Sequence, residues 1–396
     1  MALSKAVHGT LQPVFRTEWQ PIGKLGPIIP EWRSLAERAL EPNAFYEPGF
    51  ALAAAPVFGR NVYAGLVWSS DIPQKLLGLF PARVERRRYG MKLPVLVGWT
   101  HPYGPLGTPL VDRDMGEAVL GAWLDRLATD PSLPSRLLIP YLPEEGPVAR
   151  DLSSALAPRN GRNADFARHR RALLSPSADR AAYLDSALSS KKRKELRRQR
   201  RRLAENRDLA VQIASEPVAV TSALRDFLTL EAAGWKGRAG TAASHDPEVN
   251  TFLETAVVEL AREGKAQVAR LLLDRRAVAA IIVLRSGDAA WCWKIAYDES
   301  IAQASPGVQL LLDVTEALLA DATLARADSC ATPDHPMIDH IWRERLAVAD
   351  RLICVTPGGS ARFTLACALE ATRRSALGAA KALRNRLRPA AAPDRR

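Results

Sequence analysis

Residues 333–342 bring together two histidines and two aspartates, side chains that proteins use for proton transfer and for binding metals. Asp334 lies beside His335, and Asp339 lies beside His340. This spacing matches no strong metal-ligand signature, so we expect no metal here. The segment is better suited to supplying a general base or a hydrogen bond to a substrate.

Residues 234–242 combine one large aromatic side chain, two cations and three glycines, a mixture that core packing does not require. A basic, glycine-rich loop can approach a phosphate or a carboxylate closely. Trp235 would then anchor a flat group, and Lys236 and Arg238 would face the anion. The alternative interpretation is a buried Trp235 with solvated cations, and the residue types alone leave both open.

Residues 268–319 organise the second half of the chain. Three apolar runs, separated by polar or glycine-containing turns, predict an antiparallel meander of three strands. A loop ending in Ser305-Pro306-Gly307 precedes a helix that we expect to begin near Val308. Free backbone amides at the start of a helix, with the positive end of its dipole, form a phosphate-binding site. This arrangement predicts a place for a nucleotide-bearing cofactor.

The formal net charge of +12 arises from two segments, and the rest of the chain is close to neutral. Residues 189–202 hold nine Lys or Arg against one Glu, and Ser189 or Ser190 can cap a helix there. We interpret this helix as a solvated connection, a nucleic-acid patch or a basic wall for a phosphorylated ligand. It contains no aromatic stacking partner, which argues against single-stranded nucleic acid. Nucleic acid is therefore not the expected partner.

The second basic segment is the tail, residues 359–396, in which apolar residues recur at helical spacing with basic residues between them. This pattern predicts a basic amphipathic helix. Such a helix could lie on an anionic membrane surface, dock on a partner or pack against its own protein.

Three features that the sequence lacks indicate the cellular compartment of the protein. The four cysteines lack metal-ligand spacing and are too few for a disulfide framework. The first residues do not form a secretory signal, and no run reaches the roughly 18 apolar residues that span a membrane. We expect a cytoplasmic protein, peripheral at the inner membrane face if the tail binds lipid.

The order of predicted elements occurs twice, which favours two domains in a chain of 396 residues. In each half, helices precede three strand-like runs, and in the first half these runs are 62–68, 75–84 and 93–99. Residues 100–109 follow, with His101 and Tyr103 among prolines and glycines. We predict that this segment is a structural loop and not a catalytic one.

The second half resembles the GNAT family of N-acyltransferases. More narrowly, residues 191–203, 234–237, 293–299 and 305–307 are similar to the bacterial acetyltransferase group associated with cellulose biosynthesis. The first half resembles the degenerate first GNAT repeat of that group and of the peptidoglycan-bridge aminoacyl transferases. The resemblance implies an α/β (α+β) fold of two tandem GNAT-like domains, each a mixed, mostly antiparallel sheet flanked by helices. The expected divisions are 1–29, 30–175, 176–358 and 359–396, as an extension, a degenerate domain, an acyltransferase domain and the tail.

The resemblance also implies acetyl-CoA or another acyl-CoA as donor, with its pyrophosphate at the start of the helix near Val308. The implied donor-binding residues are Tyr297, Gln303, Ser305, Gly307, Val308 and Gln309. Proline stands at 306, where the family's loop has its first glycine, and this removes one amide from the cradle. We predict His335 or Asp339 as general base, supported by Asp298. The implied acceptor-binding residues are Trp235, Lys236, Arg238 and Lys294.

The expected function is transfer of an acyl group to a nitrogen or oxygen of a cell-envelope or polysaccharide-related acceptor. A second hypothesis has aminoacyl-tRNA as the donor, which would give the basic helix at 191–202 an RNA phosphate to bind. The chain lacks the long coiled-coil insertion expected for that group. A third hypothesis, favoured by Pro306, is a non-catalytic binding protein that kept the fold.

Overall fold

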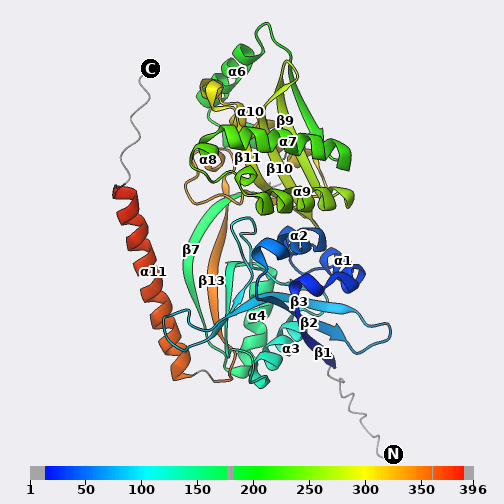
Figure 1. Cartoon of the computed structure of the whole chain (residues 1–396), viewed down its shortest axis with the longest axis vertical. Helices are drawn as coiled ribbons and strands as arrows, with labels where there is room; N and C mark the ends of the chain where they lie inside the picture. The colour runs from blue at the N-terminus through cyan, green and yellow to red at the C-terminus, as the bar shows by residue number, and fades with distance from the viewer. Residues whose placement is uncertain (1–13, 176–179, 181, 359, 388–396) are drawn as a thin grey trace, which may run out of the picture.

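The computed structural model describes residues 14–175, 180, 182–358 and 360–387 (Figure 1). The predicted boundary between the halves, at 175/176, adjoins residues 176–179, which lie outside the described residues. The first thirteen residues of the predicted extension and the last nine of the predicted tail also lie outside them.

Two helices, a three-stranded meander and a further helix follow one another in both halves of the chain, although each half also has elements that the other lacks. The first half contains β1 (Phe15–Pro21), α1 (Ile29–Glu37), α2 (Pro48–Phe58), β2 (Val62–Ser69), β3 (Leu76–Glu85), β4 (Val95–Gly98), β5 (Leu110–Val111), α3 (Gly116–Thr129), β6 (Arg136–Pro143), α4 (Pro147–Leu156) and β7 (Asn163–Leu174). The second half contains α5 (Tyr183–Ala187), α6 (Ser190–Ala204), β8 (Leu209–Ala214), α7 (Pro217–Ala233), α8 (Trp235–Arg238), α9 (Pro247–Arg262), β9 (Ala266–Leu273), β10 (Arg276–Ser286), β11 (Ala289–Tyr297), α10 (Pro306–Ala320), β12 (Arg326–Asp328), β13 (Glu344–Cys354) and α11 (Ala361–Leu387).

A single sheet of thirteen strands, counted over the described residues, runs through both halves (Figure 1). Its order is β1-β2-β3-β4-β6-β13-β7-β12-β11-β10-β9-β8, with β5 beside β3. Most neighbours are antiparallel, whereas β4 with β6 and β11 with β12 are parallel. The last strands of the halves are exchanged, because β13 pairs with β6 of the first half and β7 pairs with β12 of the second. The observed fold is the predicted mixed, largely antiparallel sheet flanked by helices.

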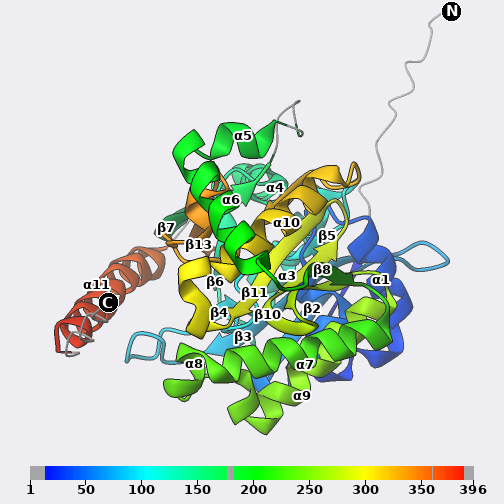
Figure 2. The same ribbon diagram turned by 90° about the horizontal axis from the view of Figure 1, so that it is seen from above.

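Helices cover both faces of the sheet in the second half. α7 and α9 pack on one face of β9, β10 and β11, and α10 and α6 pack on the other. Local side chains begin these helices: Ser189 caps α6 through the amide of Lys192, as predicted, and Asp246 caps α9 through the amides of Glu248 and Val249. Seen from above, α6 lies beside α10 (Figure 2). The basic helix is therefore part of the same layer as the predicted donor-binding helix.

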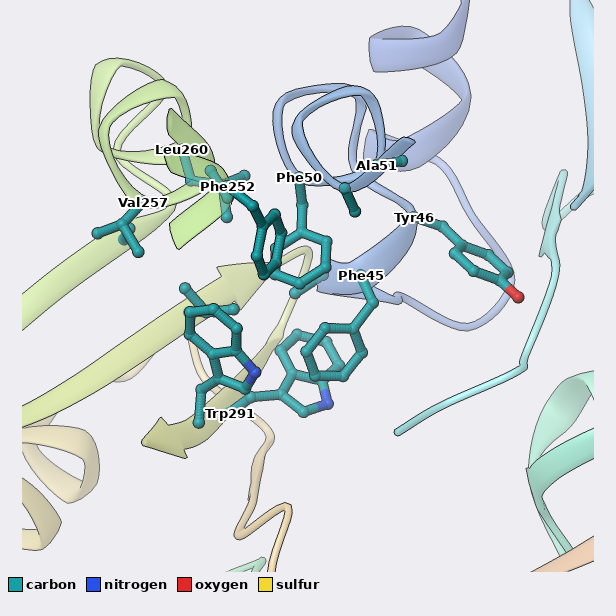
Figure 3. Close-up of a cluster of buried hydrophobic side chains, with 14 of the residues drawn as sticks. Phe45, Tyr46, Phe50, Ala51, Phe252, Val257, Leu260 and Trp291 are labelled. Atoms are coloured by element: carbon teal, nitrogen blue, oxygen red, sulfur yellow. The ribbon is translucent and has the colours of Figure 1, made fainter. Parts of the chain in front are cut away.

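An aromatic cluster joins the halves where α2 packs on α9 (Figure 3). Phe50 of α2 meets Phe252 of α9 edge to face, with ring centroids 5.4 Å apart. Phe45, just before α2, meets Trp291 of β11 at 6.1 Å. Aromatic pairs in these arrangements stabilise by about 0.5–1.5 kcal/mol beyond the area that they bury. One core therefore runs across the junction of the halves.

The tail forms α11, a helix as predicted, and its first turns pack against the sheet. Phe363 and Ala366 are buried against Val95, Leu138 and Leu352. Glu370 is fully buried and accepts two hydrogen bonds from Arg88, at 2.8 and 3.0 Å. No helix in the described parts of the chain is long and apolar enough to cross a membrane.

Several elements were absent from the prediction, among them β1, α4, β7 and β8. Residues 15–21 of the predicted loose extension form β1, which pairs with β2 along its whole length. β7 carries four basic residues, and β8 is a short edge strand whose side chains are mostly exposed although only Gln212 among them is polar. Strand pairing partners far away in the sequence decide such elements, and local propensity does not reveal them.

Candidate active site

A gap opens in the sheet beside the second part of β11. β11 pairs with β10 from Ala289 to Tyr297, but it pairs with β12 only from Ala289 to Trp291. Opposite the break in register between Ile282 and Val283, β11 carries one extra residue, a β-bulge that bends the strand. From Cys292 onward, the edge of β11 that faces β12 has no strand partner among the described residues. A ligand can therefore pair with this backbone.

The start of α10 lies at the mouth of this gap. Ser305 has a left-handed backbone, with φ 51° and ψ 50°, and its carbonyl accepts from the amide of Gln309 at 3.0 Å. Pro306 has no N–H, while the amides of Gly307 and Val308 meet no acceptor within the described residues. A Cβ on Gly307 would lie 3.0 Å from the Tyr297 ring and 3.2 Å from the end of Met337. Two free amides and a close approach of three segments make this the candidate donor-phosphate site.

The structure brings most of the predicted donor-binding residues to this point, but not all in a form suited to binding. Tyr297, Ser305, Gly307 and Val308 gather at the start of α10. Gln303 is exposed in the preceding 3-10 helix, Glu299–Ala304. Gln309 is buried, and its Nε2 donates to the carbonyl of Leu196 in α6 at 2.9 Å. The Gln309 side chain therefore holds α6 against α10 and does not face a ligand.

His335 and Asp339 lie in the loop after β12, whose Met337 contacts the start of α10. The His335 amide donates to Oδ2 of Asp339 at 3.2 Å, and the Met337 amide donates to Nδ1 of His335 at 3.3 Å. Burial lowers the pKa of His335, with Asp339 opposing this effect. With Nδ1 accepting a hydrogen bond, the proton of the neutral ring sits on Nε2. In this arrangement the ring offers a donor to a ligand.

Asp298 is occupied in a turn. Its Oδ1 accepts from the amide of Ser300 at 3.0 Å and from the Ser300 hydroxyl at 2.6 Å, and Arg276 pairs with Oδ2. The hydrogen bonds from Ser300, followed by the charge of Arg276, lower the pKa of Asp298. A carboxylate held ionised in this way caps the 3-10 helix and is a weak proton acceptor.

The segment around Trp235 corrects the predicted loop, because residues 235–238 form the short helix α8. Glu299 accepts from the Trp235 amide at 2.8 Å and pairs with Arg238 at 2.5 Å, while Lys236 pairs with the buried Glu231 at 2.6 Å. The Trp235 residue is 59% exposed. The alternative of a buried Trp235 with solvated cations is therefore wrong, since the indole is solvated and the cations are paired.

A small hollow of about 30 Å³ lies between this segment and the unpaired end of β11. It is lined by Leu230, Glu231, Gly234, Trp235, Lys236, Ile295, Ala296, Tyr297 and Glu299. This is room for about one water-sized group. The predicted acceptor residues Trp235 and Lys236 thus border the strand that the donor would use.

Lys294 of β11 meets the first half of the chain. Its Nζ lies 3.9 Å from the centre of the Tyr103 ring, and Nε1 of Trp293 donates to the Tyr103 carbonyl at 2.8 Å. Burial, together with the charge of Lys236, lowers the pKa of Lys294 to about 8. Burial and the charge of Glu231 raise the pKa of Tyr103 to about 12. The first half therefore covers an amine that can exchange a proton near neutral pH.

The loop that carries Tyr103 is anchored by a buried ion pair. Arg171 of β7 donates to the Pro105 carbonyl at 3.0 Å and to Oδ2 of Asp328 in β12 at 2.5 Å. Asp328 also accepts from the amide of Cys330 at 2.9 Å. The interpretation of 100–109 as a structural loop missed that this loop reaches the second half, because no local signal marks a contact across 190 residues.

His101, in the same loop, is a core residue. Its ring stacks on Phe58 with centroids 4.5 Å apart, and burial, aided by the charge of Lys294, lowers the His101 pKa to about 3. The described residues contain no group of three or more His, Cys, Asp or Glu placed to hold a metal ion.

Comparison with known proteins identifies the second half. Residues 190–334 match the family model of the acetyltransferase (GNAT) domain. Among curated protein sequences, none matches the chain. The match shows that residues 190–334 are similar to a GNAT-type acetyltransferase domain.

Solved structures share the fold over most of the chain. FemX aligns with a TM-score of 0.54 and 8% identity, covering 82% of this chain and 95% of FemX. The C-terminal domain of a putative lysylphosphatidylglycerol synthetase from Agrobacterium fabrum aligns with a TM-score of 0.52 and 11% identity, covering 87% and 96%. A conserved protein of unknown function from Bacteroides thetaiotaomicron aligns with a TM-score of 0.52 and 10% identity, covering 86% and 99%. Both halves of the chain therefore belong to one known architecture.

Proposed function

We propose that this chain, whose residues 190–334 form a GNAT acetyltransferase domain, transfers an acyl group from acyl-CoA to an amine or hydroxyl acceptor. One observation carries the proposal: the unpaired edge of β11 from Cys292 to Tyr297 ends at the free amides of Gly307 and Val308. A phosphate can bind at these amides, while an extended amide chain pairs with β11.

The reaction is attack of the acceptor on the thioester carbonyl, after which the C–S bond breaks and CoA leaves as its thiol. The protein has to align the two reactants, stabilise the developing oxyanion and remove a proton from the acceptor. We retain His335 or Asp339 as the predicted base, with Asp298 behind them. In the arrangement described above, Nε2 of His335 carries the proton, so Oδ1 of Asp339, which has no hydrogen-bond partner among the described residues, is the atom free to accept one. Lys294 is a further candidate, because an amine with a pKa of about 8 is partly neutral at physiological pH.

We propose an acceptor from the cell envelope or from polysaccharide synthesis, on the cytoplasmic side of the membrane. The exposed indole of Trp235 beside the hollow offers a flat apolar face to a sugar ring. The exposed Leu365 and Leu377 of α11, with its basic residues, support contact with an anionic membrane surface. The motif resemblance of residues 234–237 and 293–299 supports the link to cellulose biosynthesis.

Isothermal calorimetry and thermal shift with acetyl-CoA, longer acyl-CoAs and tRNA test the donor. We expect an acyl-CoA to bind and to stabilise the protein by about 2.7 kcal/mol at 100 times its dissociation constant. Release of free thiol from acyl-CoA in the presence of candidate acceptors then measures turnover. The absence of binding by any acyl-CoA would overturn the proposal. Binding without turnover for every acceptor would favour the non-catalytic hypothesis.

Aminoacyl-tRNA is the second candidate donor. Two observations favour it: the exposed cations of α6, and the shared fold with a domain of a putative lysylphosphatidylglycerol synthetase. Binding to tRNA would weaken steeply with added salt, since each phosphate contact releases counterions. Salt-dependent tRNA binding, together with no response to acyl-CoA, would select this donor.

A further inference from the structure

A basic groove lies along one side of α6. Its volume is about 590 Å³, and it is lined by Lys194, Arg197, Arg200, Arg201, Ala204 and Leu209. The lining contains four cations, no acid and no aromatic residue. On another side of α6, the buried Leu196 and Leu203 contact the core. Lys194, Arg197 and Arg201 are therefore not needed to hold α6 in place.

Most of these cations have no acidic partner. Arg200 pairs with Asp313 of α10 at 2.9 Å, whereas Lys194, Arg197 and Arg201 are exposed and form no ion pair with any described residue. Elsewhere on the helix, cations are compensated, as in Arg198 with Glu195 and Arg193 with Asp185. Like charges spaced three or four residues apart repel each other on a helix. An anionic ligand in the groove would remove this repulsion.

The groove is fixed close to the start of α10. The Leu196 carbonyl accepts from Gln309 in the first turns of α10, and Arg197 is the next residue along α6. Arg200, nearly three turns into α6, contacts Asp313 farther along α10. Figure 2 shows the two helices side by side. A ligand whose diphosphate rests on the amides of Gly307 and Val308 can thus extend a second phosphate toward α6.

We propose that this groove binds the phosphate on the ribose of acyl-CoA, while the start of α10 binds its diphosphate. The inference rests on the proposed function. A phosphate monoester presents three oxygens and close to two negative charges, which suits two arginine forks and a lysine. The groove has no aromatic side chain, so it recognises the phosphate and leaves the adenine ring unstacked.

The test compares acetyl-CoA with acetyl-3′-dephospho-CoA, which differs only in this phosphate. Calorimetry on the full chain should show that the wild type binds acetyl-CoA roughly tenfold or more tightly, since a charge-assisted hydrogen bond contributes about 1.5–3 kcal/mol. In the triple variant Lys194→Ala/Arg197→Ala/Arg201→Ala, this preference should disappear. Its affinity for acetyl-3′-dephospho-CoA should stay unchanged.

A matched control removes the same charge from other faces of the helix: Lys191→Ala/Lys192→Ala/Arg202→Ala. It should keep the wild-type preference, and both triple variants should melt near the wild type, because alanine favours a helix. Equal binding of the two donors by the wild type, or an equal loss in the control, overturns the inference and leaves the proposed function standing. Loss of tRNA binding in the groove variant, with the donor preference intact, also overturns it in favour of RNA. Failure of the wild type to bind either donor overturns the proposed function itself.

Discussion

The helices α3 and α10 begin at corresponding points of the two halves, each after a three-stranded meander, yet their surroundings have opposite charge. At α3, Asp112 accepts from the amide of Asp114 at 3.0 Å, and a carboxylate oxygen of Asp151 occupies the place of a Cβ on Gly116. At α10, the first turn holds no acid, and two amides are free among the described residues. An anion would be repelled at the start of α3 and attracted at the start of α10.

The gap in the sheet also differs between the halves, because it is filled in the first half and open in the second. In the first half, a Cβ on Gly107 would lie only 2.3 Å from the Pro140 carbonyl oxygen, so the 100–108 loop fills the space between β4 and β6. In the second half, β11 and β12 diverge after Trp291, and the space beside β11 is open. In the first half, the 100–108 loop therefore fills the gap between β4 and β6. The same loop places Tyr103 against the second half.

The largest effect should come from breaking the ion pair that joins the halves. Arg171→Leu leaves the Asp328 carboxylate buried without its cation, and we expect a loss of about 3–5 kcal/mol in the free energy of unfolding. Urea denaturation measures it. The control is Arg207→Ala, whose pair with Asp274 is about half exposed and should contribute at most about 1 kcal/mol. Similar losses in both variants would show that the junction is not held this way.

A larger side chain at position 107 would overpack the filled gap between β4 and β6. Gly107→Ala places a methyl group against the Pro140 carbonyl, and we expect a loss of about 1–3 kcal/mol in unfolding free energy. In contrast, Gly121→Ala, inside α3 with only an ordinary contact to Arg159, should stabilise by about 0.5–1 kcal/mol. An unchanged free energy of unfolding for Gly107→Ala would mean that the loop can move out of the gap between β4 and β6.

The contact between Tyr103 and Lys294 predicts a pH dependence. Because the folded chain releases the Lys294 proton near pH 8, while the unfolded chain keeps it to about pH 10.4, the stability of the wild type should rise with pH. Relative to Lys294→Met, we expect a gain of about 1–2 kcal/mol between pH 7 and pH 9.5. Unfolding curves at both pH values measure the gain. Tyr103→Ala, which uncovers Lys294, should reduce it, and a gain that survives this change would place the cause elsewhere.

The smallest effect is expected from a substitution that makes the start of α10 acidic, like the start of α3. Ser305→Asp puts a carboxylate at the start of α10, and its left-handed backbone suits Asp and Asn equally. We expect donor affinity to fall about tenfold through repulsion of the phosphates, with no loss in melting temperature. Ser305→Asn is the uncharged control and should bind like the wild type. Equal binding by both variants would exclude the start of α10 as the phosphate site.

Several features followed from local sequence, because each depends on residues close together in the chain. The meander of β9, β10 and β11, the cap of α6 and the helical tail have this origin, as does the turn before Pro306. The predictions that were wrong concern residues whose surroundings come from distant parts of the chain. Trp235 belongs to α8, and Gln309 binds α6, since both outcomes depend on partners 64 and 113 residues away.

The sequence by itself determined the fold class, the two related halves and the place of the helix that follows Ser305-Pro306-Gly307. The tertiary structure alone decided which helix begins with free amides, that the last strands are exchanged and that Tyr103 covers Lys294. The reason is physical: periodicity and turn chemistry act over a few residues, whereas strand pairing, burial of Arg171 with Asp328 and the pKa of Lys294 arise only when distant segments exclude water together.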